Sequence, residues 1–518
     1  MFSVVKTSCI VGLEAVPVDV EVGIKNGDRR FSILGLGGAA VRESRERILS
    51  ALEQCGIKPP DVILVNLAPA DIKKDSVIFD LPIALGIAAA VGAIPRDALK
   101  KRAFCGELSL LGEVKSAPGI VAHALAAMHA GMDTVVVPEK NAVEAALIRD
   151  INVAGVGSLA SILNALKQKA LPYITPVSET TQSRESTCSL HDVKGQYVAK
   201  RALTIAAAGG HNMLMIGPPG CGKSMLAERL GTLLPPLSSD EKIEVLKIHS
   251  VAHQPTESII SGCRPYRTPH YLVTDAGLMG GGSGPKPGEV SLAHRGVLFL
   301  DEFPEFKRSG IEALRSPMET GTIQIARARA AVEFPARFQL IAAMNPCPCG
   351  RLGSGVGSCR CSHHAVRDYL AKLSQPILDR IDLHVELDAV RVDELVWSEA
   401  NSDCVTSHNL AYDVATARAL QCKRQGGLNC ELSDARLKQV VQVENSARQL
   451  LSEMAQRLGV SARGYTRILR VAQTIADLAG RENISEEIMA EAISYRSLER
   501  LSAIVFGTSE VKATTIGI

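Results

Sequence analysis

The sequence has little net charge, no long apolar run and no pattern typical of a secretory signal, and each of these features argues against a class of protein. Its 57 Lys and Arg residues nearly balance 55 Asp and Glu residues, so no overall field attracts a polyanion and any such contact must be local. The longest apolar run, Leu81 to Ile94, contains Pro82 and is shorter than the roughly 20 residues of a membrane-spanning helix. Acidic residues within the first apolar stretch argue against a secretory signal.

A disulfide framework, a long internal repeat and a low-complexity tract are also absent from the pattern. Many of the 13 cysteines, such as Cys9, Cys55, Cys105 and Cys430, are scattered through apolar or helical contexts. This usage is typical of buried thiols in a reducing compartment. We therefore expect a soluble protein in the cytoplasm.

The length of 518 residues favours several compact units, and the patterns predict three. Apolar residues alternate from Val16 to Ile24 as in a strand, and strands and helices then alternate, which indicates an α/β domain over 1–167. The stretch 168–191 is rich in Ser, Thr and Pro and is expected to be a linker. Strands alternate with helices again over 192–390, as a parallel sheet requires, and 391–518 is predicted to be helical.

A glycine-rich loop lies between a short apolar strand and a helix in the segment MLMIGPPGCGKSMLAERL. It matches the pattern GxxxxGK[ST] in the strand-and-helix setting that this motif requires. The glycines let backbone N–H groups surround phosphate oxygens, while the lysine reaches the terminal phosphates and the serine hydroxyl ligates Mg²⁺. We therefore expect ATP and Mg²⁺ as cofactors, bound by Gly217, Pro218, Pro219, Gly220, Cys221, Gly222, Lys223 and Ser224.

Two further apolar strands end on polar residues suited to nucleotide hydrolysis. In GVLFLDE the strand leads to Asp301, expected to hold the Mg²⁺ shell, and to Glu302, expected to activate water. In FQLIAAMN the strand ends on Asn345, whose amide can orient the attacking water. Without the glycine-rich loop, the acidic pair would be interpreted as a solvated strand end and the asparagine as a turn former.

These segments make the chain resemble the AAA+ ATPases, and more closely their magnesium-chelatase-like ComM/YifB branch. The resemblance covers nearly the whole chain, through VKGQYVAKRAL, RPYRTPHYLVTDAGLMGGGSGPKPGEVSLAHRGVLFLDEFPEF, NPCPCG and SARGYTRILRVAQTIADL. It implies an AAA+ P-loop core with a parallel sheet and a C-terminal helical lid. It also implies that Asn345 is the sensor asparagine and that Val193 to Gln196 flank the adenine.

The same resemblance gives roles to three arginines. Arg380, in LSQPILDRID, matches the arginine finger that such motors insert into a neighbour's site; an ion pair with Asp379 or Asp382 is the alternative. In the lid, Arg463 matches the second sensor, with Arg467 in reserve. Because an arginine finger acts in trans only within a ring, the resemblance implies a homo-hexamer.

The N-terminal segment FCGELSLLGEVKSAPGIVAHALAAMHAGMDTVVVPEKN is similar to the proteolytic domain of Lon proteases. Proteolysis there needs a nucleophilic serine and a lysine, but the family pattern places Ile83 and Val121 at these positions. The resemblance therefore implies a degenerate Lon-protease-like α/β domain without the catalytic dyad, reused for assembly or DNA binding. Lys73 and Lys74 can offer phosphate contacts, although an exposed lysine pair is also typical of a solvated loop.

Two segments extend the expected nucleotide-binding core. One runs from Arg264 to Pro287, and the other is TIQIARARAAVEFPARF, which predicts a β-hairpin with Arg327 and Arg329 near its tip. In the resembling motors such insertions point into the central pore, where six basic tips would surround a DNA backbone. The alternative is that these arginines bind acidic residues of the next subunit.

Two CxC pairs lie close together in NPCPCGRLGSGVGSCRCSHH. Four thiolates suffice for a closed tetrahedral Zn²⁺ site, and the glycine-rich interval is flexible enough to bring the pairs together. The alternatives are that His363 or His364 replaces one cysteine, that the thiols are incidental, or that they form a labile disulfide. We expect a structural Zn²⁺ that stiffens the segment before Arg380, held by Cys347, Cys349, Cys359 and Cys361.

The sequence therefore predicts a hexameric ATPase that moves along single-stranded, forked or branched DNA, with recombination proteins as further partners and no membrane contact. The resemblance to the ComM branch implies a helicase that promotes branch migration during natural transformation. The alternative is a magnesium-chelatase-type or unfoldase-type remodeller that acts on a protein client.

Overall fold

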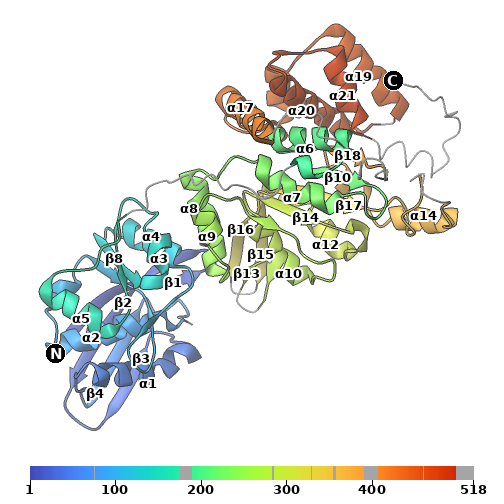
Figure 1. The fold of residues 1–518 in the computed structure, drawn as a ribbon. Helices are drawn as coiled ribbons and strands as arrows, with labels where there is room; N and C mark the ends of the chain where they lie inside the picture. Colours follow the sequence, from blue (N-terminus) through green and yellow to red (C-terminus); the bar gives the residue numbers. More distant parts are fainter. Residues whose placement is uncertain are drawn as a thin grey trace. The chain divides into compact units, whose positions relative to one another are not determined.

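The structure, a computed structural model, describes residues 1–74, 76–175, 190–282, 285–327, 330–353, 358–389, 407–458 and 460–496. Within these residues the chain forms two compact units (Figure 1). The first unit has the bounds Met1–Gln182 and Leu237–Cys263, and the second has the bounds Ser183–Pro236 and Arg264–Ile518. Most of the predicted linker, residues 176–189, lies outside the described residues.

The first unit is built on a seven-stranded mixed sheet with the order β3-β4-β2-β1-β5-β8-β9. Strand β2 pairs antiparallel with β1 and β4, while the other pairs are parallel. Its strands are β1 (Phe2–Val11), β2 (Glu14–Lys25), β3 (Arg30–Leu34), β4 (Val62–Ala68), β5 (Arg102–Phe104), β8 (Thr134–Pro138) and β9 (Asn152–Val156), with a small hairpin of β6 (Glu107–Leu108) and β7 (Val114–Lys115). Its helices include α1 (Ala39–Gln54), α2 (Asp80–Ala90), α3 (Ile120–His129), α4 (Ala142–Ala145) and α5 (Leu159–Gln168).

The alternation predicted for Val16 to Ile24 is confirmed within β2, where Val18, Val20 and Val22 are fully buried. The preceding strand β1 was not predicted from the sequence, because Lys, Thr, Ser and Cys interrupt its apolar residues. Helix α2 is buried along its whole length, as its nearly continuous apolar composition requires.

Two helices of the first unit come from a distant part of the chain. They are α8 (Ser239–Val251) and α9 (Glu257–Ile260), which follow the glycine-rich loop and its helix in sequence. Their apolar side chains Val245, Leu246 and Ile259, together with Leu237 just before α8, complete the core of the first unit. This segment lies inside the range 192–390 that the sequence pattern assigns to the ATPase core.

The second unit contains a five-stranded sheet in the order β11-β14-β17-β10-β18, parallel throughout. Its strands are β10 (Met213–Ile216), β11 (Tyr266–Arg267), β14 (Val297–Leu300), β17 (Gln339–Met344) and β18 (Leu383–Glu386). The three inner strands are buried on both faces, which explains their continuous apolar runs. Since parallel strands point the same way, the residues that follow them gather at one edge.

Helices and two hairpins surround this sheet. The helices are α6 (Tyr197–Gly209), α7 (Lys223–Leu233), α10 (Asp275–Met279), α11 (Glu289–Leu292), α12 (Arg308–Ala313), α13 (Pro317–Thr320), α14 (His363–Leu370) and α15 (Gln375–Leu378). The hairpins pair β12 (Gly280–Gly281) with β13 (Lys286–Pro287), and β15 (Thr322–Arg327) with β16 (Ala330–Pro335).

The C-terminal part of the second unit is helical, as predicted, apart from one short strand pair. Its helices are α17 (Ser407–Gln425), α18 (Asp434–Val440), α19 (Asn445–Leu458), α20 (Ala462–Leu478) and α21 (Glu486–Ser494), and β19 (Gln442–Val443) pairs with β20 (Asn483–Ile484). Helices α17 and α20 pack on α6, which continues the apolar core from the sheet into the helical part. The predicted α/β fold class is confirmed: a mixed-sheet N-terminal domain, a parallel-sheet core and a helical C-terminal region.

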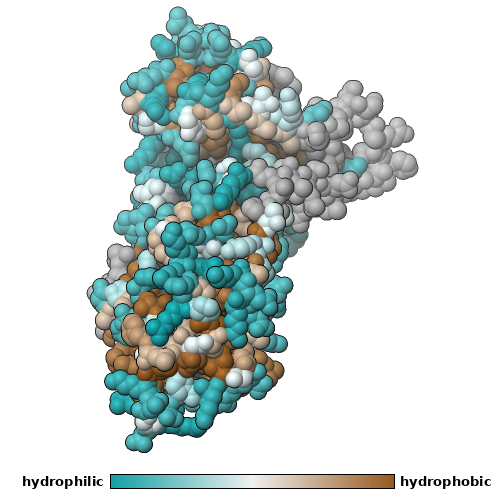
Figure 2. Space-filling view, turned by 90° about the vertical axis from the view of Figure 1, so that its left-hand side faces the viewer, coloured by the Kyte–Doolittle hydropathy of each residue, from teal (hydrophilic) through white to brown (hydrophobic). Residues whose placement is uncertain are grey.

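The surface combines polar areas with smaller apolar ones, as Figure 2 shows for the face that it draws. In the first unit, Phe2, Val4, Leu34 and Leu64 are exposed on strands of the mixed sheet. Across the described residues, no helix combines the length and the apolar composition that crossing a bilayer would require.

The substitution Leu246→Ala tests whether α8 stabilises the first unit. Because Leu246 is fully buried there, we expect the free energy of unfolding of this unit to fall by about 2–5 kcal/mol. Hydrogen exchange of β1 and β2 amides measures the change. The exposed Glu244→Ala on the same helix is the control, with an expected change within about 0.5 kcal/mol. Equal exchange in the two variants would contradict the assignment of α8 to this core.

Candidate functional site

The glycine-rich loop, residues 217–224, follows β10 at the carboxyl edge of the parallel sheet and leads into α7. Gly217 is required for space, because a Cβ there would lie 2.8 Å from both Cys221 Sγ and the carbonyl oxygen of Leu387. Gly220 and Gly222 are required for conformation, with φ of 79° and 93° in the left-handed region. The loop therefore has the tight, N–H-rich backbone that cradles phosphate.

Lys223 extends from the start of α7 back across this loop. Its Nζ donates hydrogen bonds to the carbonyl oxygens of Gly217 (2.7 Å) and Pro218 (2.9 Å) and to Asn345 Oδ1 (3.1 Å). Burial lowers the pKa of this ammonium. The contact with Asn345, which follows β17, joins two residues that the sequence pattern assigned to one site.

The two predicted Mg²⁺ ligands also meet. Ser224 Oγ donates to Asp301 Oδ2 at 2.8 Å, and Asp301 Oδ1 accepts from the backbone N–H of Glu302 at 2.9 Å. A hydroxyl and a carboxylate at this spacing provide the hard oxygen donors that Mg²⁺ takes, so the residues fit the metal.

Glu302 has an unusual backbone for a non-glycine residue. Its φ of 53° lies in the left-handed region, which costs on the order of 1–3 kcal/mol. Its side chain is exposed at the carboxyl edge of the sheet, next to Asp301. Strain of this kind is often found at functional sites, and the catalytic role of Glu302 stays a prediction.

The adenine-flanking segment predicted at Val193 to Gln196 lies beside the glycine-rich loop. Gln196 Nε2 donates to the carbonyl oxygen of Cys221 at 3.3 Å and to that of Asp388 at 2.7 Å. Gln196 also has a left-handed φ of 54° immediately before α6. Its amide therefore ties the segment to the phosphate end of the candidate site.

The predicted arginine finger is buried in the single chain. Arg380 forms an ion pair with Glu319 of α13, and its Nη1 donates to the carbonyl oxygen of Pro376 at 2.6 Å. The carboxylate that it meets is therefore neither of the predicted alternatives, Asp379 and Asp382. Glu319 was missed because it lies far from Arg380 in sequence and no local pattern marks it.

Asp382 is held by Arg467 and His211. Arg467 forms an ion pair with it, and His211 Nδ1 lies 3.3 Å from its Oδ2. Burial raises the pKa of Asp382, but Arg467 and His211 more than offset this effect, so the net shift is downward. Arg467 is therefore bound to the carboxylate that directly precedes β18. Arg463, in contrast, is exposed at the start of α20. The second-sensor role stays a prediction for Arg463.

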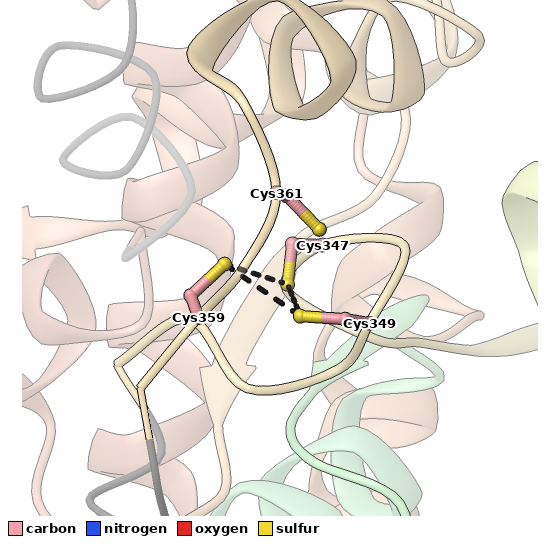
Figure 3. Close-up of side chains that lie close together, drawn as sticks. All are labelled: Cys347, Cys349, Cys359 and Cys361. Atoms are coloured by element: carbon pink, nitrogen blue, oxygen red, sulfur yellow. Dashed lines mark hydrogen bonds between the residues drawn. The ribbon is translucent and has the colours of Figure 1, made fainter.

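The four predicted zinc ligands form one cluster (Figure 3). Their sulfur atoms lie within 4.8 Å of one another, and the shortest separations are 3.3 Å for Cys347–Cys349, 3.6 Å for Cys349–Cys359 and 3.7 Å for Cys347–Cys359. Tetrahedral Zn–S bonds of about 2.3 Å require sulfur separations of about 3.8 Å, so the donor set fits Zn²⁺. These separations are too long for a disulfide bond, so the structure does not contain the labile disulfide that was one of the alternatives.

The neighbouring histidines are not part of the cluster. His363 begins α14, and His364 Nδ1 lies 2.7 Å from Asp368 on the same helix. Backbone N–H groups of Arg360 and then Arg351 lower the pKa of the Cys349 thiol to about 6, which favours the thiolate that binds metal.

The cysteine cluster touches the glycine-rich loop. A Cβ at Gly350, between the two cysteine pairs, would lie 2.6 Å from Pro219 Cδ, and Gly350 has a φ of 74°. Cys347 is fully buried and follows Asn345 by two residues. A metal in the cluster would therefore stiffen a segment in direct contact with the nucleotide loop.

The residues that the Lon resemblance assigns to the dyad positions are Ile83 and Val121. Ile83 and Val121 are fully buried in the core of the first unit. The prediction of an exposed lysine pair is wrong for Lys74, which is fully buried and donates to the carbonyl oxygen of Pro69. Its ammonium is satisfied inside the protein and is not presented to phosphate.

The basic hairpin predicted from the sequence is present as β15 and β16. They pair antiparallel from Thr322–Pro335 to Arg327–Ala330, so Arg327 is the last residue of β15. Arg329 lies outside the described residues. The role of both arginines stays a prediction.

Comparisons with known proteins agree with this arrangement. Family models described as "Magnesium chelatase, subunit ChlI", "Subunit ChlI of Mg-chelatase" and "Magnesium chelatase, subunit ChlI C-terminal" match residues 189–395, 20–141 and 405–496. The "Competence protein ComM" of Haemophilus influenzae is 40% identical over 504 residues, which cover 96% of this chain and 98% of that protein. The chain belongs to the ComM/YifB branch of the magnesium-chelatase ChlI family. An "Uncharacterized protein YifB" of Salmonella typhimurium, from the same branch, is 39% identical over 501 residues, 96% of this chain and 98% of that protein.

The N-terminal part of this ComM/YifB chain is also similar to a protease. A "Lon protease" of Chloroflexus aurantiacus is 32% identical over 148 residues, 26% of this chain and 18% of the protease. The similarity is partial and agrees with the expected Lon-like character of the first unit. The matched ChlI models imply the ATPase activity of the magnesium-chelatase-like AAA+ family.

Metal analysis tests the cysteine cluster of this ComM/YifB member. We expect about one Zn²⁺ per chain, and we expect Cys361→Ser to reduce the zinc content and the thermal stability of the second unit, because a structural site loses a ligand. Cys422→Ser removes an exposed thiol outside the cluster and serves as the control. Equal zinc contents for the two variants, or none in the wild type, would exclude a metal role for the cluster.

Proposed function

We propose that the chain is a hexameric ATPase that translocates along DNA as a helicase and promotes branch migration when incoming DNA recombines during natural transformation. The contact of Lys223 and Ser224 with Asn345 and Asp301 carries the proposal, since it gathers the parts of a hydrolytic site from three strands. The competence role rests on the relative named competence protein ComM, whose sequence this chain matches nearly from end to end.

Each residue of the site has a role that its contacts support. When bound, ATP would supply the phosphoanhydride that is cleaved. Mg²⁺ would supply positive charge and would be held by Ser224 and Asp301. Lys223 exchanges its loop carbonyls for phosphate oxygens, and Asn345 keeps hold of the lysine while it orients water. Glu302 accepts the proton of that water, a role that its exposed side chain next to Asp301 supports.

Ring assembly would complete the site with Arg380 from a neighbour. In the single chain this guanidinium is buried against Glu319. Delivery in trans therefore requires that the Arg380–Glu319 pair opens, which couples hydrolysis to subunit contact. Arg463, exposed on α20, is the proposed second sensor that reports the nucleotide to the helical part.

The basic hairpin is the proposed DNA contact. The chain has a formal net charge of +2, so the attraction to phosphate must come from local positive charge such as Arg327 and Arg329. The sixfold repetition of such a tip around a ring multiplies a modest local charge.

A remodeller of a protein client is the second candidate, because the family models are described by magnesium chelatase. The fusion to a Lon-like unit and the cysteine cluster both extend beyond what a simple chelatase motor is expected to carry. These additions favour the DNA motor.

The ATPase rate measured with and without DNA separates the two candidates. We expect single-stranded or four-way-junction DNA to raise turnover and to favour a hexamer by light scattering. Glu302→Gln should reduce the rate by about 10²–10⁴-fold while ATP binding is retained, because general-base catalysis contributes that much. If neither DNA changes rate or assembly while the protein still hydrolyses ATP, the DNA motor is wrong and the protein client is favoured.

The double variant Arg327→Ala, Arg329→Ala tests the hairpin. We expect weaker DNA binding of every sequence and a salt dependence whose slope falls by about one for each lost phosphate contact. Arg42→Ala, Arg45→Ala removes the same charge from exposed positions on α1 and is the matched control. Equal salt slopes for the two variants would assign the hairpin arginines to a subunit contact instead.

A further inference from the structure

The residues around Arg380 are held by helix α20 of the same unit. We call residues 379–382 the finger segment, which lies between α15 and β18. Arg467 Nη1, from the second turn of α20, donates to the carbonyl oxygen of Arg380 at 3.2 Å. The same guanidinium forms an ion pair with Asp382. One side chain of α20 thus binds the backbone of one residue of the finger segment and the carboxylate of another.

Two further side chains of α20 reach the same segment. Ser461, the N-cap of α20, places its Oγ 3.5 Å from Asp379 Oδ2. Thr474 Oγ1 lies 2.8 Å from Nε2 of His211, whose Nδ1 in turn lies 3.3 Å from Asp382 Oδ2. His211 and Asp382 are buried, and a buried polar network of this kind is rigid when its members are satisfied. The finger segment is therefore fixed to α20 along most of the length of this helix.

Asn212 fixes the same carbonyl oxygen from the side of the sheet. It directly precedes β10, and its Nδ2 donates to the carbonyl oxygen of Arg380 at 3.1 Å. Its Oδ1 accepts from the backbone N–H of Leu340 in β17 at 2.8 Å. Because a carbonyl oxygen has two lone pairs, Asn212 and Arg467 can bind it together. The backbone of Arg380 is thus held between the sheet and α20, and a movement of α20 relative to the sheet disturbs this arrangement.

The side chain of Arg380 is less completely satisfied than its backbone. It forms an ion pair with Glu319, and its Nη1 donates to the carbonyl oxygen of Pro376 at 2.6 Å. Its Nε is buried and has no hydrogen-bond partner among the described residues. Since a buried donor without a partner costs stability, this guanidinium gains from a new acceptor. The side chain is therefore the part of the finger segment that is suited to leave its present contacts.

Helix α20 also carries the proposed second sensor. Arg463 is exposed and lies four residues before Arg467, so the two side chains share one face of the helix. The helix is continuous from Ala462 to Leu478, and a displacement at one arginine is therefore passed to the other. One element thus joins the proposed nucleotide contact to the finger segment.

We propose that Arg467 is a positioning residue that sets the place of Arg380 according to the position of α20. The nucleotide bound by one chain then controls, through the helical part of that chain, the arginine that the chain offers to its neighbour. Arg467 acts through Arg380 in this role and does not itself contact the reacting atoms. The inference rests on the proposed function, in which Arg380 acts in trans.

The substitution Arg467→Lys keeps a positive charge beside Asp382 but removes the planar fork that also binds the carbonyl oxygen of Arg380. We expect kcat for ATP hydrolysis to fall by about 10–100-fold, because misplacement of a catalytic group by about 1 Å can cost about 10²-fold. KM for ATP should stay unchanged, since the nucleotide loop of the variant is intact.

Arg470→Lys is the matched control for this change. Arg470 lies on the same helix and pairs with a different carboxylate, that of Asp434. The control should keep the wild-type kcat. A wild-type kcat in Arg467→Lys as well would overturn the inference.

Mixed rings show on which side of the subunit interface Arg467 acts. Glu302→Gln has an inactive site but an intact Arg380, so this variant can still donate a finger. Arg467→Lys mixed with Glu302→Gln before assembly should therefore hydrolyse ATP several-fold faster than either variant alone. The mixture of Arg467→Lys with Arg380→Ala should show no such gain, because neither chain then donates a well-placed finger.

Two results of the mixing experiment would contradict the inference. A gain with Arg380→Ala instead of Glu302→Gln would mean that Arg467 acts on the nucleotide of its own chain. No gain with either partner would assign to Arg467 a structural role, which a lower melting temperature or a smaller oligomer would accompany.

The mixture of Arg380→Ala with Glu302→Gln separates this inference from the proposed function. If this mixture gains no activity, or if the wild type hydrolyses no ATP, the finger in trans fails and the role of Arg467 fails with it. If this mixture gains activity but Arg467→Lys with Glu302→Gln does not, the role of Arg467 alone fails. All rates are compared without DNA, so a lack of DNA stimulation affects neither result.

Discussion

The parallel pairing of β10, β14 and β17 is the constraint on which the candidate site depends. Met213 to Ile216 of β10 pair in register with Ile341 to Met344 of β17, which in turn pairs with β14. Every residue that follows these strands is delivered to one edge of the sheet, whatever its distance in sequence. The glycine-rich loop, the acidic pair Asp301 and Glu302, and Asn345 thus need no long-range signal of their own.

This constraint also explains which parts of the site could be predicted from the sequence. The short motifs around Lys223, Asp301 and Asn345 each combine an apolar strand with a polar end, and both features are local. The cysteine cluster was predictable for the same reason, because its four ligands lie within one short segment. The Arg380–Glu319 pair was not predictable, because its two residues are brought together only by the tertiary fold.

In the fold, too, the features with a local sequence pattern could be predicted and those that depend on distant residues could not. The helical C-terminal region and the parallel sheet follow from periodicity, and both are confirmed. Strand β1 escaped prediction since its alternation is interrupted by polar residues. The burial of Lys74 escaped prediction because its hydrogen bond to the carbonyl oxygen of Pro69, five residues earlier, depends on the path of a loop that has no periodic pattern. The membership of α8 in the first unit also has no local signature: a helix that packs on one domain has the same pattern as a helix that packs on another.

The position of α8 and α9 has a consequence for the order of folding during synthesis. The ribosome releases the N-terminal strands first, but the core of the first unit lacks Val245, Leu246 and Ile259 until the phosphate loop has also been made. The delay is on the order of 4–16 s at roughly 5–20 residues per second. During that interval the mixed sheet is an incomplete domain with an apolar face still open, and its completion falls after the first half of the nucleotide site has emerged. The N-terminal domain is thus completed late, by a segment that follows the glycine-rich loop in the sequence.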